Sequence, residues 1–140
     1  LSEIEAALTL IKVDKDDLLH IYKIDYDPKK EECIILMEYG IGTLADLLKH
    51  SLCSYENFLK DLEEQLLSQL ETLKSILFYH RDIKPANIII TSDFKFKFAD
   101  YGLAQKLEYP AENNKSGLVE HHIIGILKST KHIQKTEHFV

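Results

Sequence analysis

The segment His80–Asn87 reads HRDIKPAN and the segment Asp100–Gly102 reads DYG, and these two stretches decide the fold. Between them, short apolar runs at 87–90 and 95–98 flank the polar residues 91–93. Such a pattern predicts a β-hairpin. Side chains alternate along a strand, so the hairpin has an aromatic face and a lysine face. The aromatic face is expected to hold Phe94, Phe96 and Phe98, and the other face Lys95 and Lys97.

A long amphipathic helix is predicted before these motifs. Apolar residues recur there at steps of three or four, at Phe58, Leu62, Leu66, Leu70, Leu73 and Leu77. This spacing places them on one core-facing stripe. Ser54 is expected to cap the start of the helix, because a serine side chain accepts a hydrogen bond from an unpaired backbone N–H.

The chain upstream of residue 50 predicts a helix, a hairpin and a second, short helix. The opening helix has apolar residues at helical spacing, at Ile4, Ala7, Leu8, Leu10 and Ile11. Two apolar runs, 18–25 and 33–39, flank a turn at 27–30, which predicts two paired strands. Thr43 is expected to cap the short helix 44–49.

Composition limits the class of protein. The 140 residues are 45% hydrophobic and 29% charged, which is the balance of a soluble globular domain. No apolar run approaches the ~20 residues of a membrane helix, and the acidic first residues are unlike a secretory signal. A net charge of −6 disfavours nucleic acid and membrane as partners. The two cysteines lack metal or redox spacing, which favours an intracellular, cytoplasmic setting, with the nucleus left open.

The ordered motifs resemble those of the eukaryotic protein kinase family. HRDIKPAN matches the catalytic-loop signature H-R-D-x-x-x-x-N, and DYG resembles D-F-G with Tyr in place of Phe. A lone H-R-D is a weak signal, whereas the ordered set is specific. In this family Lys84 followed by Pro85 is typical of the serine/threonine branch. The resemblance implies an α+β, truncated kinase-like fold, with the end of an N-lobe, a hinge, and the start of a mostly helical C-lobe.

The resemblance also implies ATP and Mg²⁺ as cofactors. Phosphoryl transfer uses Mg²⁺ held by hard oxygen ligands, and Asn87 and Asp100 match the metal-binding positions. Asp82 matches the catalytic carboxylate that accepts the proton of the substrate hydroxyl or orients that hydroxyl. Lys84, the second catalytic candidate, would reach the transferring phosphate. The implied partners are ATP and a protein substrate with Ser or Thr.

The segment 34–40 resembles the last N-lobe strand and the hinge of the family. Met37 would then be the gatekeeper residue. Backbone groups of Glu38 and Gly40 would hydrogen-bond adenine, and Ile89 would form the apolar floor beneath the base.

Other motif residues have implied roles outside the chemistry. His80 matches a histidine that packs in the interior. Arg81, the single arginine of the chain, would pair with a phosphorylated residue, because its planar guanidinium binds phosphate in a bidentate manner. Either Glu3 or Glu5 would be the glutamate of the first helix that pairs with an N-lobe lysine, and the choice stays open.

We expect one partial kinase domain over 1–140. It divides into an N-lobe remnant with hinge at 1–40, a C-lobe start with the catalytic loop and DYG at 41–107, and a divergent activation-segment and tail region at 108–140. The first residue is Leu1, and the sequence holds neither G-x-G-x-x-G nor A-P-E. These features favour a fragment of a serine/threonine kinase that is inactive alone although its parent protein transfers the γ-phosphate of ATP.

Two alternatives stay open. The chain is a non-catalytic, pseudokinase-like binding module, or it belongs to a small-molecule kinase of the same superfamily. Four tail histidines lack the paired spacing of a zinc site: His121, His122, His132 and His138. Four tail hydroxyl residues are phosphosite candidates, and nothing selects among them: Ser116, Ser129, Thr130 and Thr136.

Overall fold

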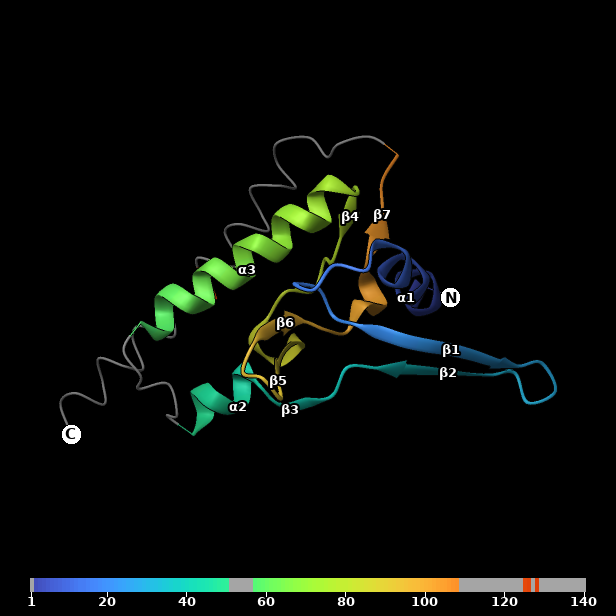
Figure 1. The fold of residues 1–140 in the computed structure, drawn as a ribbon, viewed down its shortest axis with the longest axis horizontal. Helices are drawn as coiled ribbons and strands as arrows, with labels where there is room; N and C mark the ends of the chain where they lie inside the picture. Colours follow the sequence, from blue (N-terminus) through green and yellow to red (C-terminus); the bar gives the residue numbers. More distant parts are fainter. Residues whose placement is uncertain (1, 51–56, 109–124, 127, 129–140) are drawn as a thin grey trace.

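A computed structural model describes residues 2–50, 57–108, 125–126 and 128 (Figure 1). Helix α1 (Ser2–Val13) lies beside the hairpin of β1 (Ile21–Asp27) and β2 (Glu32–Met37). A three-stranded sheet packs against the long helix, α3 (Phe58–Ser75), and its strand order is β3 (Gly40–Thr43), β5 (Ile88–Thr91), β6 (Phe96–Phe98). The other elements are short: α2 (Leu44–Lys49), β4 (Phe78–Tyr79), β7 (Gln105–Lys106), and 3₁₀ turns at Pro85–Asn87 and Tyr101–Leu103.

The first hairpin forms as predicted, with shifted boundaries. Ile24 lies opposite Ile35 in the antiparallel pair, and the strands begin and end within two or three residues of the predicted runs. Leu18 and Leu19 were expected to begin the first strand, but they lie in the loop before it and are buried in the core. Periodicity alone cannot separate a strand residue from a buried loop residue.

The predicted apolar face of α1 is partly wrong. Leu8 and Ile11 are exposed, whereas Ala6, Ala7 and Leu10 are buried. This face lies against the 3₁₀ turn 101–103. Two alanines have no long side chains, so the helix and the turn can approach closely.

The short helix α2 begins as predicted. Thr43 Oγ1 accepts a hydrogen bond from Asp46 N at 3.1 Å, and Asp46 Oδ2 accepts one from Thr43 N at 3.0 Å. This reciprocal capping box needs only residues that are close in sequence, which is why the sequence predicts it.

The core-facing stripe of α3 is confirmed over the helix itself, where Phe58, Leu62, Leu66, Leu70 and Leu73 are buried. Two details differ. The helix ends at Ser75, so Leu77 lies beyond it with a positive φ of 58°. The N-cap position is Asn57, while Ser54, the predicted cap, lies outside the described residues.

The second hairpin is confirmed, but its predicted faces are wrong at two positions. Phe96 and Phe98 are buried, whereas Phe94 is 74% exposed. Phe94 has a φ of 61°, so it belongs to the turn, where the alternation of strand faces no longer applies. Lys97 was assigned to the opposite, polar face and is also buried.

Two glutamines of α3 cover the outer edge of β6. The Gln69 amide accepts from Phe98 N at 2.8 Å and donates to Phe96 O at 2.7 Å. Gln65 Oε1 accepts from Phe96 N at 2.8 Å. Since unpaired edge groups are costly when buried, these side chains complete the sheet in place of a further strand.

The tail contributes Ile126, which is buried with the core. The four tail histidines and the four phosphosite candidates lie outside the described residues. Among the helices of the described part of the chain, none has the length and apolar character to cross a membrane.

Candidate functional site

The loop after β4 begins with His80, which is buried. Its Nδ1 accepts a hydrogen bond from Asp82 N at 3.1 Å, so Nε2 carries the proton and donates to Ala99 O at 2.6 Å. The ring also lies against Phe98 and Tyr101. Burial lowers the pKa of His80, because the charged imidazolium loses hydration there. His80 therefore has the packing position predicted for it.

Asp82 and Asn87 lie together at the two ends of the loop. Asn87 Nδ2 donates to both the backbone O and the Oδ2 of Asp82, each at 2.9 Å. The amide nitrogen thus faces Asp82, and the Asn87 Oδ1 oxygen faces away from it. Lys84 Nζ lies 3.9 Å from Asp82 Oδ1, with the lysine side chain 56% exposed. The loop therefore presents one amide oxygen, one carboxylate and one ammonium group.

The β5–β6 pair brings Asp100 to this loop. Ala99 N donates to Asn87 O at 2.8 Å, so the residue next to Asp100 is bonded to the residue that ends the loop. Asp100 has left-handed backbone angles of φ 55° and ψ 71°, and its Oδ1 accepts from Gly102 N at 3.4 Å. Asp100 is exposed, so its carboxylate is open to a ligand.

The donor set fits a magnesium ion. Asn87 Oδ1 and the Asp100 carboxylate are hard oxygen ligands, and Mg²⁺ keeps several waters, so it needs few protein ligands. No three His, Cys, Asp or Glu side chains gather as a metal cage within the described residues.

The predicted base-binding residues are brought together in part. A Cβ added to Gly40 would lie 3.1 Å from the Cβ of Ile89, so glycine allows β3 to approach β5 closely. The Glu38 carboxylate faces other groups: Oε2 accepts from Lys97 Nζ at 2.8 Å and from His20 N at 3.1 Å. The backbone N–H of Glu38 donates to His20 O at 2.8 Å. The backbone carbonyl is therefore the main-chain group of Glu38 that remains for the predicted contact with adenine.

Sequence reasoning missed Lys97 as the partner of Glu38. The two residues are 59 positions apart, and both side chains are largely buried, at 10% and 17% exposure. The only local signal is a lysine enclosed by Phe96 and Phe98 in a short apolar strand. The pair joins the predicted hinge to the strand that leads to Asp100.

Arg81 contacts the segment that follows DYG, and its pairing with a phosphorylated residue stays a prediction. Its Nε donates to Leu103 O at 2.7 Å, and its Nη1 donates to Gln105 Oε1 at 2.9 Å. Within the described residues it therefore binds the segment just after DYG. The tail hydroxyl groups proposed as its phosphorylated partners lie outside those residues.

The structure does not select between Glu3 and Glu5, because both are exposed. Met37, the predicted gatekeeper, is 42% exposed.

Tyr101 of DYG is buried against Phe78 and His80, and its hydroxyl has no hydrogen-bond partner in the described structure. Burial raises the pKa of Tyr101, because the phenolate form would lose its hydration.

Comparison with known proteins places these features in one family. The family model described as protein kinase domain matches residues 2–134. The MAP kinase kinase kinase wis4 of Schizosaccharomyces pombe is 40% identical over 84 residues, which are 59% of this chain and 6% of that protein. The serine/threonine-protein kinase cds1 of the same yeast is 45% identical over 76 residues, 54% of this chain and 16% of that protein.

A solved structure agrees with the fold. A chain in the crystal structure of the yeast RNA Pol II CTD kinase CTDK-1 complex superposes with a TM-score of 0.67 at 29% identity, covering 76% of this chain and 35% of that chain. The predicted α+β, truncated kinase-like fold is therefore confirmed. The chain spans far less than two thirds of the length of these relatives.

Proposed function

Because the chain belongs to the protein kinase domain family, we propose that it carries the phosphoryl-transfer residues of a serine/threonine protein kinase. The substrate is ATP with Mg²⁺, and the acceptor is a Ser or Thr hydroxyl of a protein. Lys84 followed by Pro85 and the similarity to cds1 support the serine/threonine branch. The proposed division of the domain is 1–40, 41–107 and 108–140.

One observation carries the proposal. The Asn87 side-chain Nδ2 donates a hydrogen bond to the Asp82 carboxylate at 2.9 Å. The Asn87 backbone carbonyl accepts one from the backbone N–H of Ala99, the residue before Asp100. The backbone bond between Ala99 and Asn87 thus places Asp100 next to the hydrogen-bonded pair of Asp82 and Asn87. A set of this kind positions a metal, a phosphate and a hydroxyl before reaction, which is the main contribution of a protein to phosphoryl transfer.

Each residue has a distinct role in the proposal. Asn87 Oδ1 and the Asp100 carboxylate would hold Mg²⁺, and the ion would neutralise negative charge on the nucleotide phosphates. Asp82 would accept a hydrogen bond from the acceptor hydroxyl and orient its oxygen toward the phosphate. Lys84 lies near enough to Asp82 to place a positive charge beside the transferred group.

The base would lie between the hinge and β5. The Glu38 backbone carbonyl would accept a hydrogen bond from the base, the backbone of Gly40 would provide a second polar contact, and Ile89 would pack against the ring. The Glu38–Lys97 pair would hold the hinge backbone in register with β6. We further propose that these 140 residues alone do not transfer phosphate, since no glycine-rich phosphate loop occurs among them.

Magnesium-dependent nucleotide binding tests the proposal. A fluorescent ATP analogue is titrated into the purified chain with and without Mg²⁺. Asp100→Asn is expected to remove the Mg²⁺ dependence and weaken binding about tenfold, whereas Asp25→Asn, on the other hairpin, is the matched control. Equal affinity of Asp100→Asn and wild type at every Mg²⁺ concentration would refute the metal role. Nucleotide binding without any Mg²⁺ dependence in the wild type would favour the pseudokinase-like module.

A further inference from the structure

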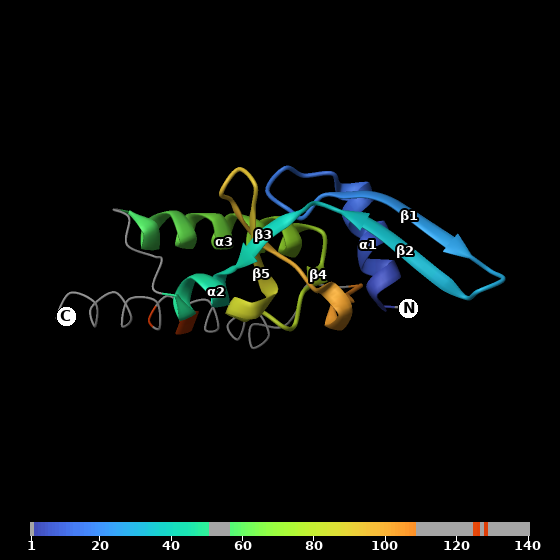
Figure 2. The ribbon, with the colours of Figure 1, turned by 90° about the horizontal axis from the view of Figure 1, so that it is seen from below.

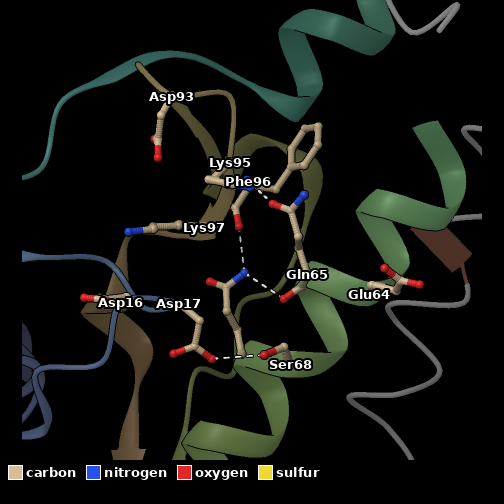
Figure 3. Close-up of a pocket in the computed structure, with 10 residues that line it drawn as sticks. Asp16, Asp17, Glu64, Gln65, Ser68, Asp93, Lys95, Phe96 and Lys97 are labelled. Atoms are coloured by element: carbon tan, nitrogen blue, oxygen red, sulfur yellow. Dashed lines mark hydrogen bonds between the residues drawn. The ribbon is translucent and has the colours of Figure 1, made fainter. Parts of the chain in front are cut away.

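Lys97 lies directly opposite Ile89 in the β5–β6 pair, and Ile89 is the residue proposed above to pack beneath the base. Figure 3 shows Lys97 on β6 next to Phe96, which is bonded to Gln65 of α3. The backbone of Lys97 is therefore held between the strand that carries the proposed floor of the base site and the long helix.

The side chain of Lys97 reaches another wall of the same site. Its Nζ donates to Glu38 Oε2 at 2.8 Å, and the lysine and glutamate side chains are only 10% and 17% exposed. One residue thus contacts both the floor strand and the residue whose backbone carbonyl is proposed to accept from the base. The spacing of Ile89 and Glu38 therefore depends on Lys97.

Glu38 is oriented by hydrogen bonds to two segments. Its backbone N–H donates to His20 O at 2.8 Å, and its Oε2 accepts from His20 N at 3.1 Å as well as from Lys97. Of these three bonds, only the one from Lys97 connects the hinge to the β5–β6 pair. The direction of the Glu38 backbone carbonyl relative to Ile89 follows from it.

A buried ion pair fixes geometry more than it adds stability. Both ions lose their hydration, so such a pair gains little over two apolar side chains of similar size. A hydrogen bond between charged groups is nevertheless short and directional, so it defines the positions of both partners. A pair of this kind is therefore expected where the position of a backbone group matters.

We propose that Lys97 is a positioning residue for recognition of the nucleotide base. Through Glu38 it holds a backbone carbonyl where that carbonyl accepts from an amino group of the base, as in adenine. A keto group at the same place, as in guanine, sets two acceptors against each other and leaves both unpaired. Lys97 thus contributes to a preference for adenine over guanine nucleotides. This role rests on the proposed nucleotide site and adds a determinant of its selectivity.

The test is competition of unlabelled ATP and GTP, each with Mg²⁺, against the fluorescent ATP analogue on the full chain. Lys97→Met is expected to weaken ATP binding about tenfold and GTP binding less than about twofold, so the ratio of the two affinities falls about fivefold. Loss of folded protein alone would lower both apparent affinities by the same factor and leave the ratio unchanged. The matched control is Lys95→Met, which removes the same charge from an exposed position on the same hairpin. It is expected to leave both affinities within about twofold of the wild type.

Two milder variants keep both charges. Lys97→Arg retains a charged donor for Glu38 and is expected to recover part of the ratio lost in Lys97→Met. Glu38→Asp shortens the link by one methylene, so the hinge backbone shifts and the ratio is expected to fall while the protein stays folded. Urea unfolding of each variant gives its folded fraction.

The other outcomes contradict the proposal. An unchanged ratio in Lys97→Met, or in Glu38→Asp should Lys97→Met not fold, would overturn the role of Lys97. An equal fall of the ratio in Lys95→Met would assign the effect to the charge of the hairpin. Equal binding of ATP and GTP by the wild type would remove the selectivity but leave the Mg²⁺-dependent site standing, whereas binding of neither nucleotide would overturn the proposed function itself.

Discussion

The two β-hairpins of this chain are alike in sequence and unlike in surroundings. Both pair two short apolar strands across a polar turn. In β1–β2, Tyr26 and Ile34 are more than 60% exposed, whereas in β5–β6, Phe98 is fully buried. Figure 2 shows β1–β2 extending away from the rest of the chain, with α1 beside it.

The difference lies in what each hairpin contacts. The β5–β6 pair is bonded to β3 on one edge and to Gln65 and Gln69 on the other, and Lys97 ties it to Glu38. The proposed metal ligands Asn87 and Asp100 directly flank this pair. The hairpin that is bonded along both edges is thus the one that carries the proposed chemistry, as expected where reacting groups must be held in place.

The largest expected contrast is between the aromatic residues of the two hairpins. Phe98→Ala is expected to lower the free energy of unfolding by about 4 kcal/mol, because a fully buried ring leaves a cavity. Tyr26→Ala, at an exposed site, is expected to lower it by less than about 1 kcal/mol. Urea unfolding followed by circular dichroism measures both. Comparable losses for the two variants would contradict the contrast.

The second contrast is between two lysine–carboxylate pairs. Lys97→Met leaves the Glu38 carboxylate largely buried and unpaired, so we expect a loss of about 3 kcal/mol. Lys23→Met breaks the exposed pair with Asp25 and is expected to cost less than about 0.5 kcal/mol. The same unfolding measurement applies, and nucleotide affinity is expected to fall only in Lys97→Met. A neutral Lys97→Met would show that the pair does not anchor the hinge.

The third prediction concerns the covered edge of β6. Gln69→Leu removes the partners of Phe96 O and Phe98 N in a buried place, with an expected loss of about 2 kcal/mol. Glu71→Leu, an exposed position on the same helix, is the control and is expected to stay within about 0.5 kcal/mol. If both variants unfold at the same urea concentration, the glutamine does not stabilise the edge.

The smallest expected effect is a pH dependence from His80. Its pKa is lower in the folded chain than the usual 6.5, so the unfolded chain binds more protons as the pH falls below that value. The contribution of His80 to stability is therefore complete above about pH 6.5 and declines as the pH falls toward the folded-state pKa. Unfolding of wild type and His80→Gln between about pH 7.5 and 5 measures it. The difference between the two proteins should shrink on acidification, and a constant difference would contradict the prediction.

Features set by neighbouring residues were predictable. The stripe on α3 follows from helical period, and the Thr43–Asp46 capping box needs residues three apart. The order of HRDIKPAN, hairpin and DYG also predicted the fold that the comparisons confirm. The proposed site residues Asp82 and Asn87 are close in sequence, and the structure brings them within hydrogen-bonding distance.

Features that depend on distant residues were missed or misplaced. Phe94 was assigned to the aromatic face because alternation takes no account of where a turn begins. Lys97 was assigned to a polar face because its partner Glu38 is 59 positions away. Gln69 received no role at all, although it holds the edge of β6.

By itself, the sequence determined the family, the principal elements and the chemical types of the proposed site, since these depend on local period, turn residues and ordered motifs. Only the tertiary structure decided which lysine is buried and which hairpin is bonded along both edges. The physical reason is that burial and charge pairing arise when chain segments far apart in sequence meet, and a local pattern carries no information on that meeting.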